Sequence, residues 1–186
     1  MFAQVFLAAL LLSIPFATPR ERAVLVYPKE RWSLRPVFYT DHQRKLVREI
    51  ATYYDVRIHE QVADDDDLFS IDVDGAKLLV LSAHGDPFSM HFASPRERTL
   101  DATDRQRLAR FLARLDPDAT ILLQSCHTAK GFAHLVKAAA GPRRRVIAAK
   151  GVIPPDGVTI TEHAPFDVRI ICRDRGRTYD CTARIN

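Results

Sequence analysis

The sequence has little excess of one charge over the other, few cysteines and a single long apolar run. The net charge of +4 arises from 27 basic residues distributed among 23 acidic ones. The chain therefore lacks the clustered positive charge of a nucleic-acid-binding protein, and no nucleic acid is expected as a partner. No internal repeat occurs, and no second long apolar run follows residue 18. With 47% hydrophobic residues, positions 19–186 are expected to form one soluble domain with its own core.

The one long apolar run occupies residues 1–18 and begins MFAQVFLAALLLSIPFA. It is too short to span a membrane comfortably, and it ends in small residues, Ala17 and Thr18, that suit signal cleavage. No basic residue precedes the run, and Pro15 stands where a small residue is preferred. Two alternatives therefore remain, a cleaved secretory signal and an uncleaved N-terminal anchor. Both predict an extracytoplasmic protein, secreted or periplasmic, with no membrane contact beyond that anchor.

The rest of the chain alternates between strand and helix patterns. Strands are predicted at residues 23–28, 56–62, 76–85, 119–126 and 145–152. Helices are predicted at residues 40–54, 101–117 and 132–142, with an acidic loop at 63–75 and a short hairpin at 87–94. Strands separated by helices indicate right-handed crossovers. The expected fold is therefore α/β, a three-layer α/β/α domain with a mostly parallel central sheet, plus a C-terminal β-hairpin within a β extension at residues 157–186.

Two predicted strands end in chemically reactive residues. In open parallel sheets, sites lie beyond the carboxyl ends of the strands. The third predicted strand ends in His84-Gly85, and the fourth ends in Cys126-His127. If these two strands are neighbours in the sheet, His84 and Cys126 converge on one rim. His127 is a rival partner for the thiol, but adjacent residues of an extended strand point to opposite faces, which favours His84.

The segments LLVLSAHGD and ILLQSCHTAKG resemble the paired motifs of the caspase-like cysteine peptidases (clan CD). The layout of SCHTAKGFAHLVKAAAGPRRRVIAAKGV is most similar to that of CHAT domains, and the resemblance covers about residues 76–152. The histidine and the cysteine are 42 residues apart, close to the roughly fifty of caspases.

This resemblance implies an endopeptidase with a His-Cys dyad and no cofactor, acting on a peptide or protein substrate. Cys126 would be the nucleophile and His84 the acid/base, while the backbone N–H groups of Gly85 and Cys126 would face the oxyanion. Gly85 would let the substrate backbone approach closely. The alternatives are a non-catalytic caspase-like module that binds a protein partner, and a structural domain with an inert thiol. The spacing of Cys126 and the histidines matches no common zinc pattern, so no metal is expected.

The resemblance also places a specificity pocket around the fifth strand and the loop after it. Lys150 there could attract an acidic side chain, whereas Asp156 or Glu162 could attract a basic one, and the sequence does not choose between them. The basic run at residues 143–145 raises the question of an anion site.

The other two cysteines, Cys172 and Cys181, flank a turn-forming segment, RDRGRT. If Gly176-Arg177 forms a two-residue turn, the two cysteines lie directly opposite each other, which would permit a disulfide in an exported protein. Cys126 would then be left as the odd, free thiol. The alternative is a pair of reduced cysteines in a hairpin with a different register.

Overall fold

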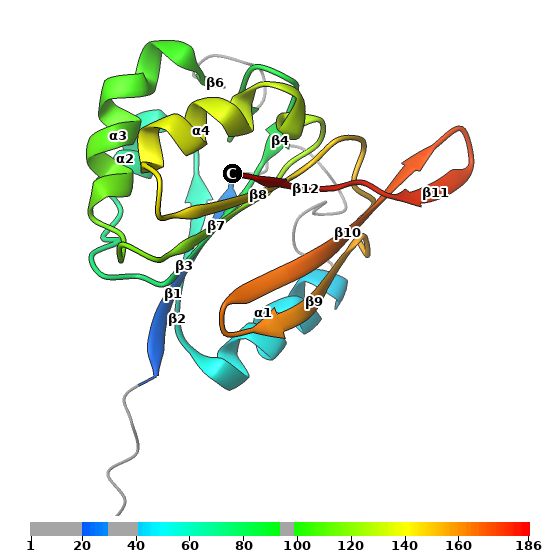
Figure 1. Cartoon of the computed structure of the whole chain (residues 1–186), viewed down its shortest axis with the longest axis horizontal. Helices are drawn as coiled ribbons and strands as arrows, with labels where there is room; N and C mark the ends of the chain where they lie inside the picture. The colour runs from blue at the N-terminus through cyan, green and yellow to red at the C-terminus, as the bar shows by residue number, and fades with distance from the viewer. Residues whose placement is uncertain (1–19, 30–40, 94–98) are drawn as a thin grey trace, which may run out of the picture.

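The computed structural model describes residues 20–29, 41–93 and 99–186 (Figure 1). The apolar segment expected to be a signal or an anchor, residues 1–18, lies outside this part of the chain. Within the described ranges, no helix has both the length and the apolar character that crossing a membrane requires.

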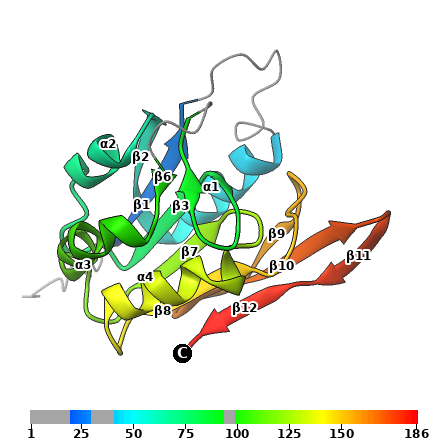
Figure 2. The same cartoon turned by 90° about the horizontal axis from the view of Figure 1, so that it is seen from above.

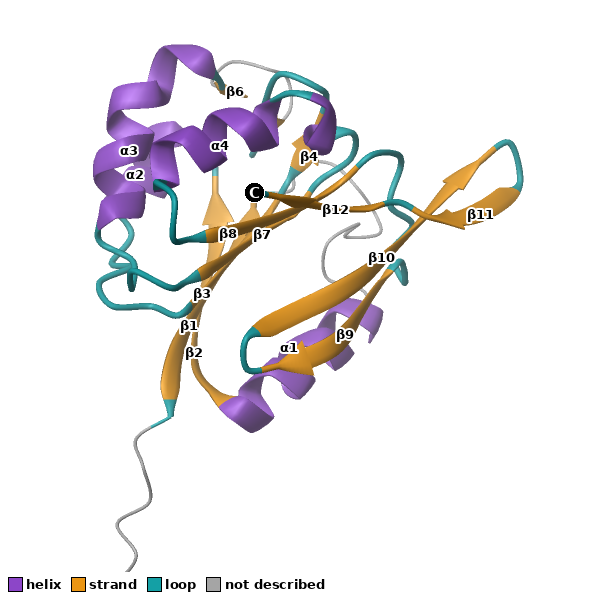
Figure 3. Cartoon of the chain, viewed as in Figure 1, coloured by secondary structure: helices purple, strands orange, loops and turns teal. Residues whose placement is uncertain are grey.

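A six-stranded sheet forms the centre of the domain (Figure 3). Its order is β12-β8-β7-β3-β1-β2, and its strands are β1 (Glu21–Pro28), β2 (Tyr54–Val62), β3 (Leu78–Ser82), β7 (Thr120–Gln124), β8 (Arg145–Ala149) and β12 (Thr182–Ile185). Every pairing is parallel except that of β12 with β8. The prediction of an α/β fold with a mostly parallel sheet is confirmed. Every residue of β3 and β7 is buried, and the two strands are apolar except at Ser82, Thr120 and Gln124, as expected for strands covered on both faces.

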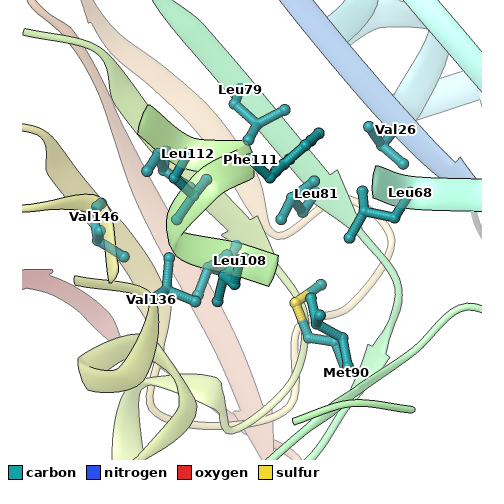
Figure 4. Packing of buried hydrophobic residues seen from close by; sticks show 14 of the residues in the cluster. Val26, Leu68, Leu79, Leu81, Met90, Leu108, Phe111, Leu112, Val136 and Val146 are labelled. Carbon is teal, nitrogen blue, oxygen red and sulfur yellow. The ribbon is translucent and has the colours of Figure 1, made fainter. Parts of the chain in front are cut away.

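Helices cover most of one face of this sheet, and Met90, Phe92 and Leu100 from the hairpin region after β3 share their buried cluster. The helices are α2 (Asp65–Ser70), α3 (Arg105–Ala113) and α4 (Phe132–Ala140), with the 3₁₀ turns η1 (Ala102–Asp104) and η2 (Thr128–Lys130) at the starts of α3 and α4. Figure 4 shows Leu108, Leu112 and Val136 from α3 and α4 packed together beside the sheet residues Leu79 and Val146. Alternate residues of each strand enter this cluster, so the strand period of two divides the core between the two faces.

A helix and two strands cover the opposite face, which differs from the expected α/β/α layering. There α1 (Asp41–Tyr53) packs beside β9 (Val158–His163) and β10 (Phe166–Asp174), as Figure 1 shows below the sheet. Leu46 and Ile50 of α1 share one buried cluster with Phe166, Val168 and other residues of β10.

The C-terminal strands belong to two different sheets, whereas a single appended hairpin was expected. Antiparallel pairing joins β9, β10 and β11 (Arg177–Asp180), after which the chain returns as β12 along the edge of the central sheet (Figure 2). The turn between β10 and β11 is Arg175-Gly176, at φ 46° and 79°, so the expected turn at Gly176-Arg177 was one residue off. A hairpin turn with both central φ values positive is the type I′ form, which matches the twist of the flanking strands.

The shifted turn changes the cysteine register but not the pairing. Cys172 lies opposite Tyr179, and Cys181 lies two residues further along the chain. Cys172 and Cys181 nevertheless form a disulfide, with their Cα atoms 5.7 Å apart. Diagonal neighbours in a regular antiparallel ladder are about 7–8 Å apart, too far for a disulfide. Cys181 lies just beyond the end of β11 at Asp180, where its Cα comes within bonding range of Cys172. A disulfide is consistent with an oxidising, extracytoplasmic location.

The predicted third strand, residues 76–85, is divided at Ala83. Its first part is β3, whereas β4 (His84–Gly85) leaves the central sheet and pairs with β5 (Met90–His91), which in turn pairs with β6 (Thr99–Leu100). The hairpin expected at residues 87–94 therefore begins earlier, at His84.

Candidate functional site

The two strands that carry the motif residues are neighbours in the central sheet. β3 and β7 pair in parallel, with Ser82 opposite Gln124 at their carboxyl ends. The buried Ser82 hydroxyl donates a hydrogen bond to Gln124 Oε1 over 2.9 Å, which ties the two ends together. His84 and Cys126 each follow two residues later. The topology therefore brings both residues to the same rim of the sheet.

Gly85 is where the two strand ends come into contact. A Cβ atom at this position would clash with the Ser125 hydroxyl and would lie 3.1 Å from the Cys126 carbonyl oxygen. Glycine is thus required because the neighbouring turn occupies the space that a side chain would fill. The resemblance implied that Gly85 lets a substrate backbone approach; the structure shows that Ser125 and Cys126 also approach it closely.

A pocket of about 90 Å³ opens at this rim, and both His84 and Cys126 line it. Segments that follow β1, β3, β7 and β8 all contribute to its wall, which consists of Gln43, Ala83, His84, Gln124, Ser125, Cys126, Ile153, Pro154 and Pro155. Its place beyond the carboxyl ends of the parallel strands agrees with the general rule for open α/β sheets.

Sequence reasoning missed the amide and proline residues of this pocket. Gln43 lies in the first turn of α1, and Gln124 is the last residue of β7. The Ile153-Pro154-Pro155 segment follows β8, so the same strand-end rule that singled out His84 and Cys126 also pointed to this segment. These side chains carry no nucleophilic or titratable group that would have marked them as site residues.

Cys126 is the free cysteine of the chain, and its side chain is half-buried. The backbone N–H of Ile153 donates a hydrogen bond to its sulfur over 3.4 Å. Since the thiolate is the nucleophilic form of cysteine, a donor aimed at the sulfur stabilises the charge that reactivity requires.

The turn after β7 sets the direction of the thiol. β7 ends at Gln124 rather than at Cys126 as expected, and the chain turns through His127, whose φ of 60° is left-handed. Such a conformation is uncommon for residues other than glycine and costs about 1 kcal/mol or more. The His127 N–H donates to the Gly151 carbonyl over 3.0 Å, which holds the turn against the loop after β8.

His127 is not part of the pocket wall, but strand alternation is not the reason. Cys126 and His127 lie in a turn, not in an extended strand, so strand alternation does not apply to them. Among the residues that the structure describes, no partner reaches the buried Nδ1 of His127. His84 is therefore the histidine that shares the pocket with Cys126.

The hairpin that carries His84 is stabilised by an aspartate at its tip. Asp86 accepts hydrogen bonds from the backbone N–H groups of Phe88 and Ser89, and its Oδ2 lies 3.1 Å from His91 Nε2. Burial acts to raise the pKa of Asp86, but these hydrogen bonds outweigh it and lower the pKa to about 2.

The Gly85 N–H takes no part in the hydrogen bonds between β4 and β5. Asp86 and Ser89 form a hydrogen-bonded pair, since the Asp86 N–H donates to the Ser89 carbonyl over 3.1 Å. Hydrogen-bonded and non-hydrogen-bonded pairs alternate along an antiparallel ladder, so the Gly85–Met90 pair is of the second kind. The N–H of Gly85 consequently points away from β5.

The three charged residues expected to form a specificity pocket are not in this wall. Lys150 is exposed, and its backbone N–H donates to the Cys181 carbonyl. Asp156 lines an adjoining pocket of about 110 Å³ that shares Gln43, Gln124 and Pro155 with the first. Glu162 is exposed on β9 and lines neither pocket.

The arginines at residues 143–145 contact separate partners at the opposite, amino-terminal end of β8. Arg143 forms two hydrogen bonds with the Asp118 carboxylate, and Arg145 lies 3.6 Å from Asp167. Arg144 donates to four backbone carbonyl oxygens. The three side chains therefore do not converge on a common anion.

In the ranges 20–29, 41–93 and 99–186, no group of three or more histidine, cysteine, aspartate or glutamate side chains is placed to hold a metal ion. No protein-family model and no curated protein sequence matches the chain.

Proposed function

We propose that the chain is an exported, caspase-like cysteine endopeptidase that uses His84 and Cys126 as its dyad. The observation that supports this most directly is their placement: they follow neighbouring parallel strands and line one pocket. The Ile153 N–H at the sulfur and the left-handed turn at His127 add features typical of a prepared nucleophile. The Cys172–Cys181 disulfide supports export.

In the proposed reaction the Cys126 thiolate attacks the carbonyl carbon of the scissile peptide bond. A carbon–sulfur bond forms, and the carbonyl oxygen becomes negatively charged. The backbone N–H groups of Gly85 and Cys126 stabilise this oxyanion, and the orientation of the Gly85 N–H away from β5 fits that role. His84 gives a proton to the leaving amine as the carbon–nitrogen bond breaks, then takes a proton from the water that hydrolyses the thioester.

The pocket beside the thiol favours a small, uncharged substrate side chain. Among the described residues of its wall, the only titratable side chains are His84 and Cys126 themselves. Apolar groups of Ile153, Pro154 and Pro155 and the amides of two glutamines make up most of the rest. A volume of about 90 Å³ is far below the roughly 300 Å³ of typical small-molecule pockets. None of Lys150, Asp156 and Glu162 lines this pocket, and selection of a charged residue by one of them stays a prediction.

The test combines a peptide library with a thiol-directed covalent probe on the purified protein. We expect the wild-type protein to cleave after small neutral residues, and to be labelled at Cys126. Cys126→Ser should abolish both signals, and His84→Ala should reduce cleavage by roughly 10²–10⁴-fold, the usual contribution of an acid/base. His134→Ala removes an exposed histidine of α4 and serves as the matched control, with unchanged activity.

Two outcomes would sink the proposal. Equal, slow labelling of the wild type and His84→Ala, with no peptide cleaved by either, would indicate a non-catalytic module that binds a partner. Labelling of Cys126 only after denaturation would indicate an inert structural thiol, which its half-buried position argues against.

A further inference from the structure

The loop between β8 and β9 is joined by its backbone to the strands that carry the disulfide. The Lys150 N–H donates to the Cys181 carbonyl over 3.0 Å, and the Arg173 N–H donates to the Val152 carbonyl over 2.9 Å. Cys181 is one end of the Cys172–Cys181 disulfide, and Arg173 directly follows the other. The loop is therefore fixed at two successive points to the disulfide-linked strands.

The same loop is joined by its other edge to the turn that carries the thiol. The Gly151 carbonyl accepts from the His127 N–H over 3.0 Å, and the Ile153 N–H donates to Cys126 Sγ over 3.4 Å. Gly151 and Ile153 thus contact the turn that carries Cys126, whereas Lys150 and Val152 contact the strands that the disulfide joins. Residues 150–153 bridge the two like a strand between two neighbours.

Gly151 lies at the point where this bridge is tightest. A Cβ atom there would clash with the Tyr179 hydroxyl and would lie 3.1 Å from Cys172 Sγ and 3.2 Å from its Cβ. The disulfide therefore packs directly on the backbone of the residue whose carbonyl holds the thiol turn. Gly151 is buried, and so are both cysteines of the disulfide.

We propose that the Cys172–Cys181 disulfide is a positioning element of the thiol site. By fixing residues 150–153 from one side, it holds the Ile153 N–H at the Cys126 sulfur and the Ile153–Pro155 wall beside the pocket. The functional meaning of this arrangement rests on the proposed role of Cys126 as nucleophile. The change that it predicts, an altered reactivity of the Cys126 thiol when the disulfide is absent, can be measured without any substrate.

The first experiment compares the wild type with the double variant Cys172→Ser/Cys181→Ser. We expect alkylation of Cys126 by iodoacetamide to slow by about fivefold or more, since a hydrogen bond to a charged group is lost or weakened. Backbone amide exchange of residues 150–157 should become faster by about tenfold or more because local opening is easier. Arg144→Met, which acts at the opposite end of β8, is the control for general loss of stability and should leave the rate of Cys126 alkylation unchanged.

A second set of variants keeps the disulfide intact, in case the double variant fails to fold. Gly151→Ala should slow Cys126 alkylation, because the added methyl group displaces the bridge from Tyr179 and Cys172. Tyr179→Phe alone should have no effect, since the Tyr179 ring is half-exposed and only its hydroxyl would meet the new methyl group. Gly151→Ala/Tyr179→Phe should recover part of the lost rate. Absence of this rescue would show that the clash with Tyr179 is not what displaces the bridge.

The results separate this inference from the proposed function. Slower alkylation in the disulfide variant, with no peptide cleaved by any form, would support the positioning role and remove the peptidase. Equal alkylation and equal peptide cleavage in both forms would support the peptidase and overturn the positioning role. Alkylation of Gly151→Ala at the wild-type rate would also overturn it.

Discussion

Arg144 provides the sharpest test of the energetics of this fold, because its neighbour in sequence offers a matched control. The Arg144 guanidinium donates to the carbonyl oxygens of Asp116, Ala140, Ala113 and Leu115, at 3.1, 2.8, 3.1 and 2.7 Å. Ala113 and Ala140 are the last residues of α3 and α4, so one side chain satisfies the free carbonyl groups at both helix ends. Burial lowers the pKa of Arg144 from its ordinary value, but arginine stays protonated in proteins.

The magnitude follows from the number of acceptors that lose their donor in Arg144→Met. Three of the four hydrogen bonds are partly buried, and at about 1 kcal/mol net for each, their loss should cost ~3 kcal/mol. For a domain of this size, that corresponds to a fall in Tm of roughly 6–12 °C. Arg143→Met removes an ion pair with Asp118 whose side chains are 65% and 57% exposed. That change should cost only about 0–1 kcal/mol.

Urea denaturation followed by circular dichroism would measure both variants. The reasoning would be refuted if Arg143→Met and Arg144→Met lowered the free energy of unfolding by equal amounts. It would also be refuted if added phosphate stabilised the wild type but neither variant, since that would mean that the arginines share an anion after all.

Two further predictions concern contacts that the tertiary structure creates. Gly85→Ala should destabilise the domain by about 1–3 kcal/mol through overpacking against the Ser125 hydroxyl. Adding Ser125→Ala to this variant should recover most of the lost free energy of unfolding, measured by urea denaturation. Additive effects of the two substitutions would contradict this packing contact. Tyr54 donates to the His163 carbonyl, and burial, with a smaller contribution from the Glu21 charge, raises the pKa of Tyr54 to about 12. Because the pKa of Tyr54 is raised on folding, its contribution to stability is present below pH 10 and is lost as the pH rises toward 12. The free energy of unfolding should therefore fall less steeply with rising pH in Tyr54→Phe than in the wild type. An unchanged pH profile would show that the hydroxyl ionises freely.

Much of the fold could be predicted from the sequence because strand and helix periods are local. The apolar runs of β3 and β7 and the amphipathic pattern of α3 and α4 are each contained in one short segment. Parallel pairing follows from their alternation. Placing His84 and Cys126 near strand ends needed nothing more, since a strand end is itself a local signal, although β3 and β7 each end two residues earlier.

The hairpin register and the covering of the second face could not be obtained in this way. A turn led by glycine was the natural expectation, but the strands instead place Arg175 at φ 46° ahead of Gly176. The turn residues by themselves allow either position, whereas β10 is also packed against the central sheet by long-range contacts that the local sequence does not encode. Strands β9 and β10 occupy a face that the sequence pattern assigned to helices, because an apolar strand and an apolar helix can bury the same surface.

The sequence alone determined that a thiol and an imidazole follow two strands of a parallel sheet, and that two other cysteines stand close enough along the chain to pair. Tertiary structure decided what surrounds the thiol. Ile153 and Gly151 carry no reactive side chain, and they matter through their backbone N–H and C=O groups, which every sequence contains. Only the packing of the loop after β8 between the disulfide and the turn at Cys126 gives those groups a position, because hydrogen bonds between distant segments depend on where the chain returns.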